Sequence, residues 1–188
     1  MRLSNTFAVK RPVDAVWTAF ADVPSVTQCL PGAELIADHG DGTYEGSVQI
    51  KLGPMAAKFE GDATVTRDNA ARRGHIAGKG VDRSGGNRGQ VEVDYAVTAI
   101  DSGSSVTVDA DISLSGAIAQ FGRSGLVEEI TKRLINEFVE CLEAKMSAET
   151  VEEADAIEAG DVKGLSLFLS GLLSWIGKFF KRLLGRGD

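Results

Sequence analysis

The sequence predicts an α+β fold, in which a curved antiparallel sheet wraps around a long carboxy-terminal helix and a separate amphipathic helix follows. Three observations lead to this prediction. Apolar residues alternate with a period of two over residues 33–115, they return to helical spacing over 116–146, and residues 164–188 are both apolar and basic. A chain of 188 residues suits one domain of ordinary size with an appendage.

The chain begins with a strand and a short helix. Residues 3–10 alternate apolar and polar side chains, which indicates a strand. Pro12 is favourable in a first helical turn and apolar residues follow it at helical spacing, so a helix is expected over 12–21. Two prolines and a glycine within 22–32 predict a turn that contains at most one turn of helix.

About six strands are expected between residues 33 and 115. Their clean alternation is typical of an antiparallel sheet with one dry face and one wet face. The glycine-rich stretch 78–89 lies between strands, not before a helix, which argues against a phosphate-binding loop. A mobile hairpin with bulges is the expectation for this stretch, with a lid or a docking surface as the alternative.

The long helix is expected within residues 116–146. Its apolar stripe repeats every fourth residue, at Leu126, Ile130, Leu134, Phe138 and Leu142. Nothing else in the chain is long enough to cover the dry face of the sheet, so this helix must do so. A helix lying across a concave sheet often leaves an apolar cavity, which is a common ligand site.

Charge is distributed unevenly along the chain. Residues 163–188 hold five cations and one anion, a net charge of +4, so the remaining residues carry −11 of the total of −7. The acidic body argues against a nucleic-acid binder. The first residues lack the apolar block of a signal peptide, so a cytoplasmic location is expected.

The end of the chain, residues 164–188, predicts a helix that lies in the plane of a membrane surface. Its apolar residues fall within about half of a helical wheel, and its cations could meet anionic head groups. A transmembrane helix, a docking helix for a protein partner and packing on its own domain are the alternatives; the uncharged run is short for a membrane span. The expected membrane-binding residues are Phe168, Leu172, Trp175, Ile176, Lys178, Phe179, Phe180, Lys181, Arg182 and Leu183.

Residues 147–163 separate the expected domain, 1–146, from this helix. They hold six acids and no aromatic residue, which is typical of a flexible, self-repelling linker. The alternative is that their first part prolongs the preceding helix. Cys29 and Cys141 are expected to be reduced thiols in or near the core, with a disulfide or a reactive thiol as the minor interpretation.

Motifs for catalysis and metal binding are not found. His39 and His75 have no ligand spacing, and acids such as Asp62 and Asp94 fall on the wet face, where a solvated surface is the expected role. We therefore expect no catalytic residues and no metal site. The apolar inward residues form either the hydrophobic core or the wall of a ligand cavity. Gly46 and Gly61, which are among the inward residues, would leave room for a ligand. The candidate wall residues are Trp17, Phe20, Phe59, Tyr95, Phe121, Leu126 and Ile130.

Four stretches resemble the G-subunit family of carbon monoxide dehydrogenase, within the START-like, helix-grip (SRPBCC) superfamily. They are residues 7–17, residues 29–34 with Leu30-Pro31-Gly32, residues 51–61 with Leu52-Gly53-Pro54, and residues 115–122. The resemblance covers residues 1–146. It implies a helix-grip fold and a non-catalytic accessory protein that recruits a molybdenum hydroxylase, such as carbon monoxide dehydrogenase, to the membrane.

Together, these inferences predict a membrane anchor that also binds a respiratory quinone, menaquinone or ubiquinone, between the sheet and the long helix. The protein would be peripheral on the inner face of the cell membrane. Tyr95 could donate a hydrogen bond to a quinone carbonyl. The alternatives are a pure adaptor with a filled core and a cyclase-like enzyme with the same fold, for which Asn5 and Tyr95 are the polar candidates.

Overall fold

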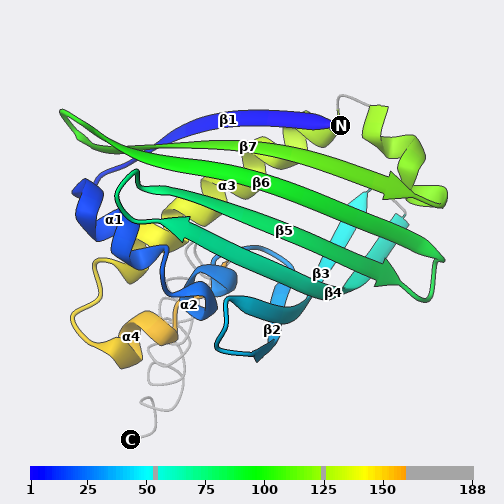
Figure 1. Cartoon of the computed structure of the whole chain (residues 1–188), viewed down its shortest axis with the longest axis horizontal. Coiled ribbons are helices and arrows are strands. Elements are labelled where there is room, and N and C mark those ends of the chain that lie inside the picture. Colours follow the sequence, from blue (N-terminus) through cyan, green and yellow to red (C-terminus); the bar gives the residue numbers. More distant parts are fainter. Residues whose placement is uncertain (53–54, 124–125, 160–188) are drawn as a thin grey trace, which may run out of the picture.

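One antiparallel sheet and one long helix dominate the structure, a computed structural model that describes residues 1–52, 55–123 and 126–159, without the side chains of 52–55 and 121–130. The helix α3 lies across one face of the sheet, and α1, α2 and α4 gather near its carboxy-terminal end (Figure 1). The elements in chain order are β1 (Arg2–Val9), α1 (Val13–Ala19), α2 (Val23–Gln28), β2 (Ala33–Asp38), β3 (Thr43–Leu52), β4 (Met55–Asp68), β5 (Arg73–Asp82), β6 (Asn87–Ile100), β7 (Gly103–Ser115), the 3-10 helix η1 (Ala117–Arg123), α3 (Leu126–Lys145) and α4 (Val151–Asp155).

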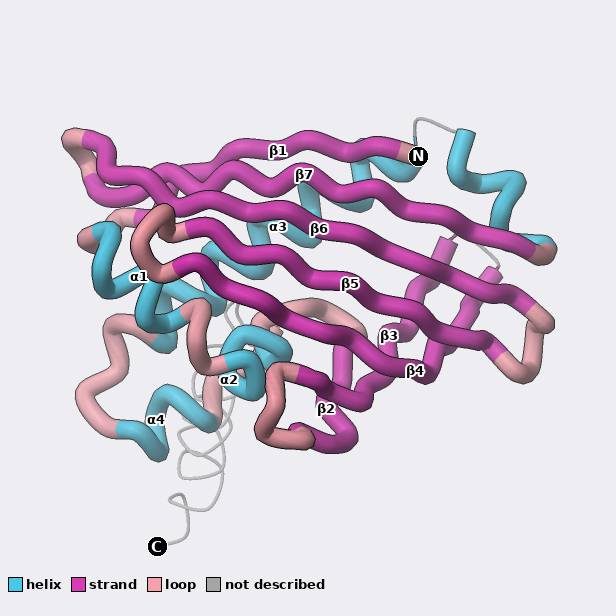
Figure 2. The backbone as a smooth tube through the Cα atoms, in the orientation of Figure 1, coloured by secondary structure: helices cyan, strands magenta, loops and turns pink. Residues whose placement is uncertain are grey.

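The seven strands lie in the order β1-β7-β6-β5-β4-β3-β2, and every neighbouring pair is antiparallel. Strands β2 to β7 therefore follow one another as a meander, and β1 joins at the β7 edge (Figure 2). The strand count and the face alternation expected from the sequence are confirmed. The expected α+β class and the two helices around Val16 and Phe138 are confirmed as well.

A row of glycines crosses four strands of the sheet. Gly46 pairs with Gly61, Gly61 with Gly80, and Gly80 with Gly89. A Cβ atom on Gly61 would lie 1.9 Å from the backbone oxygen of Lys79, so only glycine permits this approach of β4 and β5. These glycines therefore serve strand contact, and the expectation that Gly46 and Gly61 leave room for a guest is wrong, because neighbouring backbone occupies that space.

Two loops and the linker are more ordered than the sequence indicated. The segment 22–32 contains α2, which is six residues long and capped by Asp22, whose carboxylate accepts a hydrogen bond from the Ser25 N–H at 3.1 Å. In the glycine-rich stretch, the strands β5 and β6 leave only residues 83–86 as a turn. The expected flexible linker holds α4, which begins after a break and does not prolong α3.

The two cysteines form a disulfide that joins the end of α2 to α3. Cys29 and Cys141 are both fully buried, and their Cα atoms are 5.4 Å apart. The expectation of two reduced thiols is therefore wrong. Sequence spacing could not reveal this pair, because 112 residues separate the two cysteines and only the packing of α2 against α3 brings them together.

The buried apolar residues of the described chain form two separate clusters. The larger cluster joins β1, β6, β7 and α1 to the carboxy-terminal half of α3, with Val9, Val16, Val106 and Leu142 fully or almost fully buried. The smaller cluster consists of Ala57, Phe59 and Ile118, with Ile50 and Leu114 packed against it. The sheet is therefore clamped at both ends, by α1 and α3 at one and by η1 at the other.

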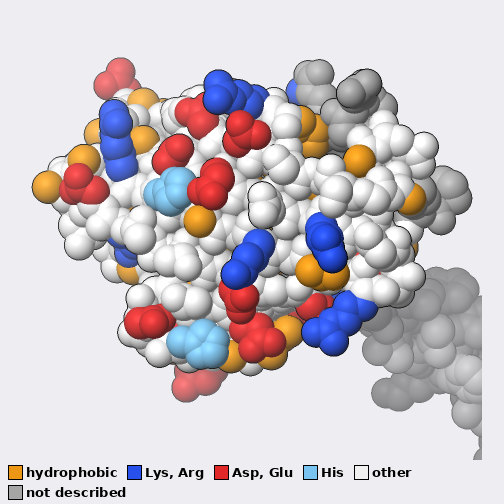
Figure 3. Space-filling model, turned by 45° about the vertical axis from the view of Figure 1, so that its right-hand side comes forward, with side chains coloured by type: hydrophobic (Ala, Val, Ile, Leu, Met, Phe, Trp, Pro, Cys, Tyr) orange, Lys and Arg blue, Asp and Glu red, His pale blue; other side chains and the backbone are white. Residues whose placement is uncertain are grey.

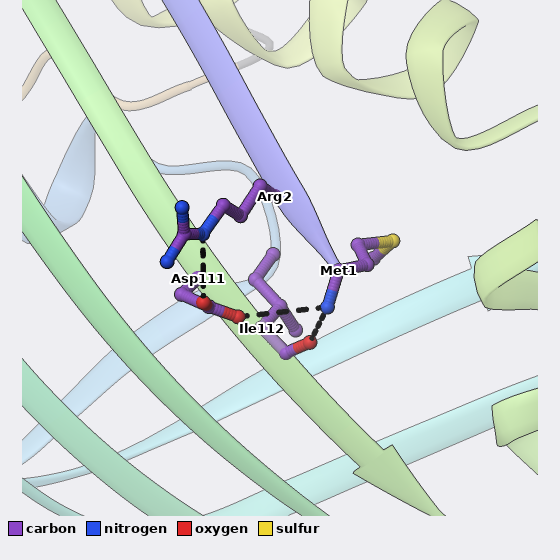
Figure 4. Close-up of polar contacts among 4 residues, drawn as sticks. All are labelled: Met1, Arg2, Asp111 and Ile112. Atoms are coloured by element: carbon purple, nitrogen blue, oxygen red, sulfur yellow. Dashed lines mark hydrogen bonds and ion pairs between the residues drawn. The ribbon is translucent and has the colours of Figure 1, made fainter.

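The face of the sheet turned away from α3 is polar and carries charges of both signs (Figure 3). At the β1 edge, Arg2 and the amino group of Met1 pair with Asp111 at 3.2 and 3.6 Å, and the Arg2 hydrogen bond lowers the pKa of that carboxyl group (Figure 4). His75 does not stand alone, because its two ring nitrogens lie 2.9 Å from Asp94 and from Glu92. The Asp94 hydrogen bond raises the pKa of His75.

Candidate functional site

The inward face of the sheet between the two core clusters is apolar and only half covered. Two rows of residues cross it from strand to strand, and register partners share a face. All ten residues of these rows are of intermediate exposure, in contrast to the buried residues at either end. The rows are Tyr44, Ala63, Gly78, Val91 and Ile112, and Val65, Ile76, Val93, Ala110 and Leu3.

At Leu134, α3 does not seal this floor. Leu134 is one turn from Phe138 and two turns from Cys141, so it lies on the sheet-facing side of the helix. Cys141 is fully buried, whereas Leu134 remains 40% exposed. On the sheet, Val48 belongs to the same inward face as its partner Phe59, and yet it is 43% exposed. Two apolar side chains of the inward face, Leu134 and Val48, therefore stay exposed to solvent.

One end of the floor is closed by aromatic residues from the predicted wall. Trp17 on α1 and Phe20 directly after α1 both contact Tyr95 on β6, with ring centroids 6.1 and 5.6 Å apart. Phe20 also meets Phe138 of α3 at 6.1 Å. The structure thus brings three of the predicted residues together, as a cluster in which the rings pack on one another.

Of the other predicted wall residues, only Phe59 has a described side chain, and it does not join this cluster. Phe59 lies in the smaller cluster, packed against the glycine row, where its Cβ would be 3.2 Å from a Cβ on Gly80. The side chains of Phe121, Leu126 and Ile130 lie outside the described residues. So do the predicted membrane-binding residues, Phe168, Leu172, Trp175, Ile176, Lys178, Phe179, Phe180, Lys181, Arg182 and Leu183.

The hydroxyl group of Tyr95 lies against a neighbouring strand, β5. Its ring lies along the sheet over Gly74, where an added Cβ would come within 2.2 Å of the hydroxyl oxygen. Arg67 is the cation on this side; its guanidinium lies 4.0 Å above the Trp17 ring and it donates to the Trp17 carbonyl. Burial raises the pKa of Tyr95, so its hydroxyl stays neutral.

The polar pair expected of a cyclase-like site is not assembled. Asn5 and Tyr95 both pair with Val108 of β7, so one strand lies between them. Among the residues that the structure describes, no group of His, Cys, Asp or Glu side chains is arranged to hold a metal ion.

A buried polar network at the other end of the floor was missed by sequence reasoning. Asp82 accepts hydrogen bonds from Ser84 and Gly85 in the turn and from the Asn87 side chain at 2.8 Å. These hydrogen bonds lower the pKa of Asp82 to about 2, and the bond from the Ser84 side chain has the largest effect. The Asn87 side-chain oxygen then accepts from the Ile118 N–H at 3.0 Å, which holds η1 against the sheet. The sequence does contain a signal for this network, because an acid, Asp82, and an amide, Asn87, flank the four-residue turn 83–86.

A third group of contacts fixes the chain where it leaves α3. Lys145 is 8% exposed, and its ammonium group donates to the Gln28 side chain at 2.5 Å and to the Ala154 carbonyl at 2.8 Å. The Ala159 N–H donates to the Gln28 carbonyl at 2.8 Å. Burial lowers the pKa of Lys145, against the attraction of Asp155. The segment through Ala159 is therefore docked next to the Cys29–Cys141 disulfide.

Two surface hollows lie away from this floor. One, of about 450 Å³, is bordered by Lys10, Pro12 and Ile100; the other, of about 330 Å³, is bordered by Arg67, Arg73 and His75. Neither is bordered by α3. Within the described part of the chain, no helix has both the length and the apolar character needed to cross a membrane.

A meander wrapped around a carboxy-terminal helix, with an apolar inner floor, defines a helix-grip protein of the START-like kind. The model of one family, the G subunit of carbon monoxide dehydrogenase (CoxG), matches residues 6–147. This match covers most of the chain, which therefore belongs to the CoxG family. No curated protein matches the sequence.

Solved structures confirm the fold. A conserved protein from Geobacillus kaustophilus has a TM-score of 0.67 at 20% identity, over 78% of this chain and 95% of its own. The Zhui aromatase/cyclase from Streptomyces sp. R1128 has a TM-score of 0.53 at 17% identity, over 79% and 96% of the two chains. Ara h 8.0201 has a TM-score of 0.52 at 14% identity, over 78% of this chain and 97% of its own. At these identities the likeness shows the fold alone.

Proposed function

We propose that this chain is a non-catalytic accessory protein that brings a molybdenum hydroxylase of the carbon monoxide dehydrogenase type to the inner face of the cell membrane. We propose further that it binds a respiratory quinone, menaquinone or ubiquinone, between the sheet and α3. Membership of the CoxG family supports the accessory role. The single observation that carries ligand binding is the apolar, half-covered floor between two separate core clusters.

The dimensions and chemistry of the floor favour a long apolar guest. Along β6, six residues separate Tyr95 of one cluster from Gly89 beneath Phe59 of the other. At about 3.4 Å per residue, the floor is about 20 Å long. Its two rows contain no charged side chain, so a guest held there would be hydrocarbon over most of its length. A prenylated quinone fits this description, and a soluble dehydrogenase needs access to such an acceptor.

In the proposed complex, the aromatic cluster and Phe59 form the two end walls. Trp17, Phe20 and Tyr95 are already packed on one another, so they offer a firm boundary and not a flexible lining. The Tyr95 hydroxyl lies over Gly74, and we do not assign it a hydrogen bond to the quinone.

Filling the floor tests the ligand site. Ala110→Phe places a large side chain on the inward face of β7, whereas Ala77→Phe places the same group on the outward face of β5. Organic extraction and mass spectrometry of the purified proteins should find quinone with the wild type and the Ala77 variant, and much less with the Ala110 variant. A wild-type protein that carries no quinone and ignores added menaquinone and ubiquinone would end the ligand proposal and leave the accessory role.

The membrane role rests on the sequence of residues 164–186 and has a separate test. Phe179→Ser with Phe180→Ser removes apolar area from the expected membrane-binding face and leaves the cations in place. Co-sedimentation of the full chain with vesicles that contain anionic lipid should fall at least tenfold. Undiminished binding by this variant would contradict the assignment.

A further inference from the structure

One unmatched charge faces inward beside the aromatic cluster. On the inward face of the described strands β4 to β7, only Arg67 and Asp82 are charged. The Asp82 carboxylate is buried and accepts four hydrogen bonds, which come from Ser84, Gly85 and Asn87. The charge of Asp82 is therefore fully matched by the protein, and Arg67 is the inward charge that needs an explanation.

The guanidinium group of Arg67 is held against α1 but meets no anion. Its Cζ atom lies 4.0 Å from the centroid of the Trp17 ring, and Nη2 donates to the Trp17 carbonyl. The amide oxygen of Asn69 is already used, because it accepts from the indole N–H of Trp17 at 3.0 Å. Among the side chains that the structure describes, no carboxylate forms an ion pair with Arg67. A half-buried cation without a counter-charge is unusual, because removing a charge from water is costly unless the charge is paired.

One nitrogen of this guanidinium group lacks an acceptor. Nε of Arg67 is buried, and no atom in the described part of the chain accepts its hydrogen. A buried donor that is left unsatisfied destabilises a fold by more than a typical hydrogen bond stabilises it. The orphan donor and the unpaired cation therefore indicate the same missing partner, an oxygen atom with a negative or partial negative charge.

Arg67 lies directly beyond the apolar floor. It follows Val65, a residue of the floor, by two positions on the same strand, which is about 7 Å. Ile76, the register partner of Val65, packs against the cluster that contains Tyr95. Val65, Ile76 and Arg67 are all of intermediate exposure. A hydrocarbon guest on the floor would therefore end next to the guanidinium group, where α1 lies against the β4–β5 hairpin (Figure 1).

We propose that Arg67 binds the oxygen-bearing head group of the guest and so fixes its orientation on the floor. The head group lies at the aromatic end, beside Trp17, and the hydrocarbon chain runs along the two rows toward Phe59. The side chain of Arg67 is only partly buried, and a change of rotamer can present its donors to a head group.

This inference rests on the proposed ligand site and adds the polar residue that its two apolar rows do not supply. A quinone carbonyl and a fatty-acid carboxylate share the required chemistry, since each offers an acceptor oxygen at the end of a long hydrocarbon chain. The experiment has to separate these two sources.

The test uses the full chain and ligands with and without a head group. They are short-chain menaquinone and ubiquinone, a fatty acid, and squalene, which contains no oxygen. Arg67→Met keeps an unbranched apolar stem against the Trp17 ring and removes every donor. Native mass spectrometry should show that the oxygen-bearing ligand of the wild type binds at least tenfold more weakly to this variant, with squalene binding unchanged. Arg67→Lys keeps the cation and should lose less affinity than Arg67→Met.

Arg73→Met is the matched control. Arg73 lies at the same end of the sheet, on β5, but it faces outward with its register partner Ala96. This variant should bind every ligand as the wild type does. Urea midpoints of the three variants are recorded as well, so that affinities are compared among folded proteins.

Trp17 reports where the head group lies. Labelling with 5-fluorotryptophan gives two fluorine resonances, and Trp175→Phe identifies the one that belongs to Trp17. The ring current of a bound quinone should displace the Trp17 resonance several times more than squalene does. A quinone ring at the Phe59 end of the floor, about 20 Å away, would leave this resonance unmoved.

Each outcome decides between the two proposals. Undiminished binding of the oxygen-bearing ligand by Arg67→Met, or an equal loss of squalene binding, would overturn the role of Arg67 and leave the ligand site. Binding of squalene alone by the wild type would overturn it too. Binding of the fatty acid but of neither quinone, with the expected loss in Arg67→Met, would support the role of Arg67 and contradict the quinone. A wild type that binds none of these ligands would end both proposals.

Discussion

Reduction of the Cys29–Cys141 disulfide should lower the stability of the domain markedly. The bond closes a loop whose ends are 112 residues apart. In the chain-entropy model, a loop of this size restricts the unfolded chain by about 4–5 kcal/mol at 25 °C, and native disulfides typically contribute about 2–5 kcal/mol. We expect the free energy of unfolding to fall by about 3–5 kcal/mol. For a chain of this size, that corresponds to a loss of roughly 6–20 °C in Tm.

The assay is urea unfolding of the same preparation with and without a phosphine reductant. Using one chain avoids the added effect of burying two hydroxyl groups, which a Cys29→Ser, Cys141→Ser variant would introduce at fully buried positions. That variant serves as the control and should be insensitive to reductant. Alkylation in intact cells, followed by mass measurement, establishes whether the bond exists at the site of function, since disulfides are rare in reducing compartments. Two alkylated cysteines, or equal urea midpoints with and without reductant, would refute the reasoning.

Three further outcomes follow from individual contacts. The pKa of Asp82 is lowered from 3.8 to about 2, so the stability that its carboxylate contributes is full above about pH 4 and is lost as the pH falls toward 2. Asp82→Asn should therefore have a lower free energy of unfolding than the wild type near neutral pH. In unfolding measurements at decreasing pH, this difference between the two proteins should shrink between about pH 4 and pH 2. Gly61→Ala should destabilise by about 1–3 kcal/mol or more in urea, whereas Gly89→Ala, whose added Cβ meets only ordinary contacts at 3.4 Å and beyond, should cost less; equal effects would contradict the close strand approach. Lys145→Met should speed amide hydrogen exchange in residues 151–159 but not in the sheet, and unchanged exchange there would show that the ammonium group does not hold α4.

Most of the fold could be predicted because it is encoded in local periodicity. Every second residue is apolar from Val91 to Val97 of β6 and from Val106 to Leu114 of β7, and an antiparallel meander follows from such alternation together with short turns. Helix α3 was predictable for the same reason, because its apolar residues recur at every fourth position. What local patterns do not contain is long-range pairing: Cys29 with Cys141, or Lys145 with Gln28, depends on the angle at which α3 crosses the sheet.

The candidate site was predictable by face but not by position along the strand. Periodicity correctly placed Phe59 and Tyr95 on the inward face, yet they belong to separate clusters. Alternation says which side a residue faces and nothing about which end of the sheet a helix covers. The exposure of Leu134 is a second example, because its spacing is that of a core residue and yet 40% of it is exposed.

The division of the interior into two unequal parts has a consequence for kinetics. The larger part ties five elements together, namely β1, β6, β7, α1 and α3, whereas the smaller depends on Ile118, Phe59 and Ala57, and the buried side chain of Asn87 fastens η1 to it. The two ends of the sheet should therefore differ in their free energy of local opening, and we expect the lower value at the η1 end. Local opening at that end can therefore occur while the larger part stays folded, without global unfolding.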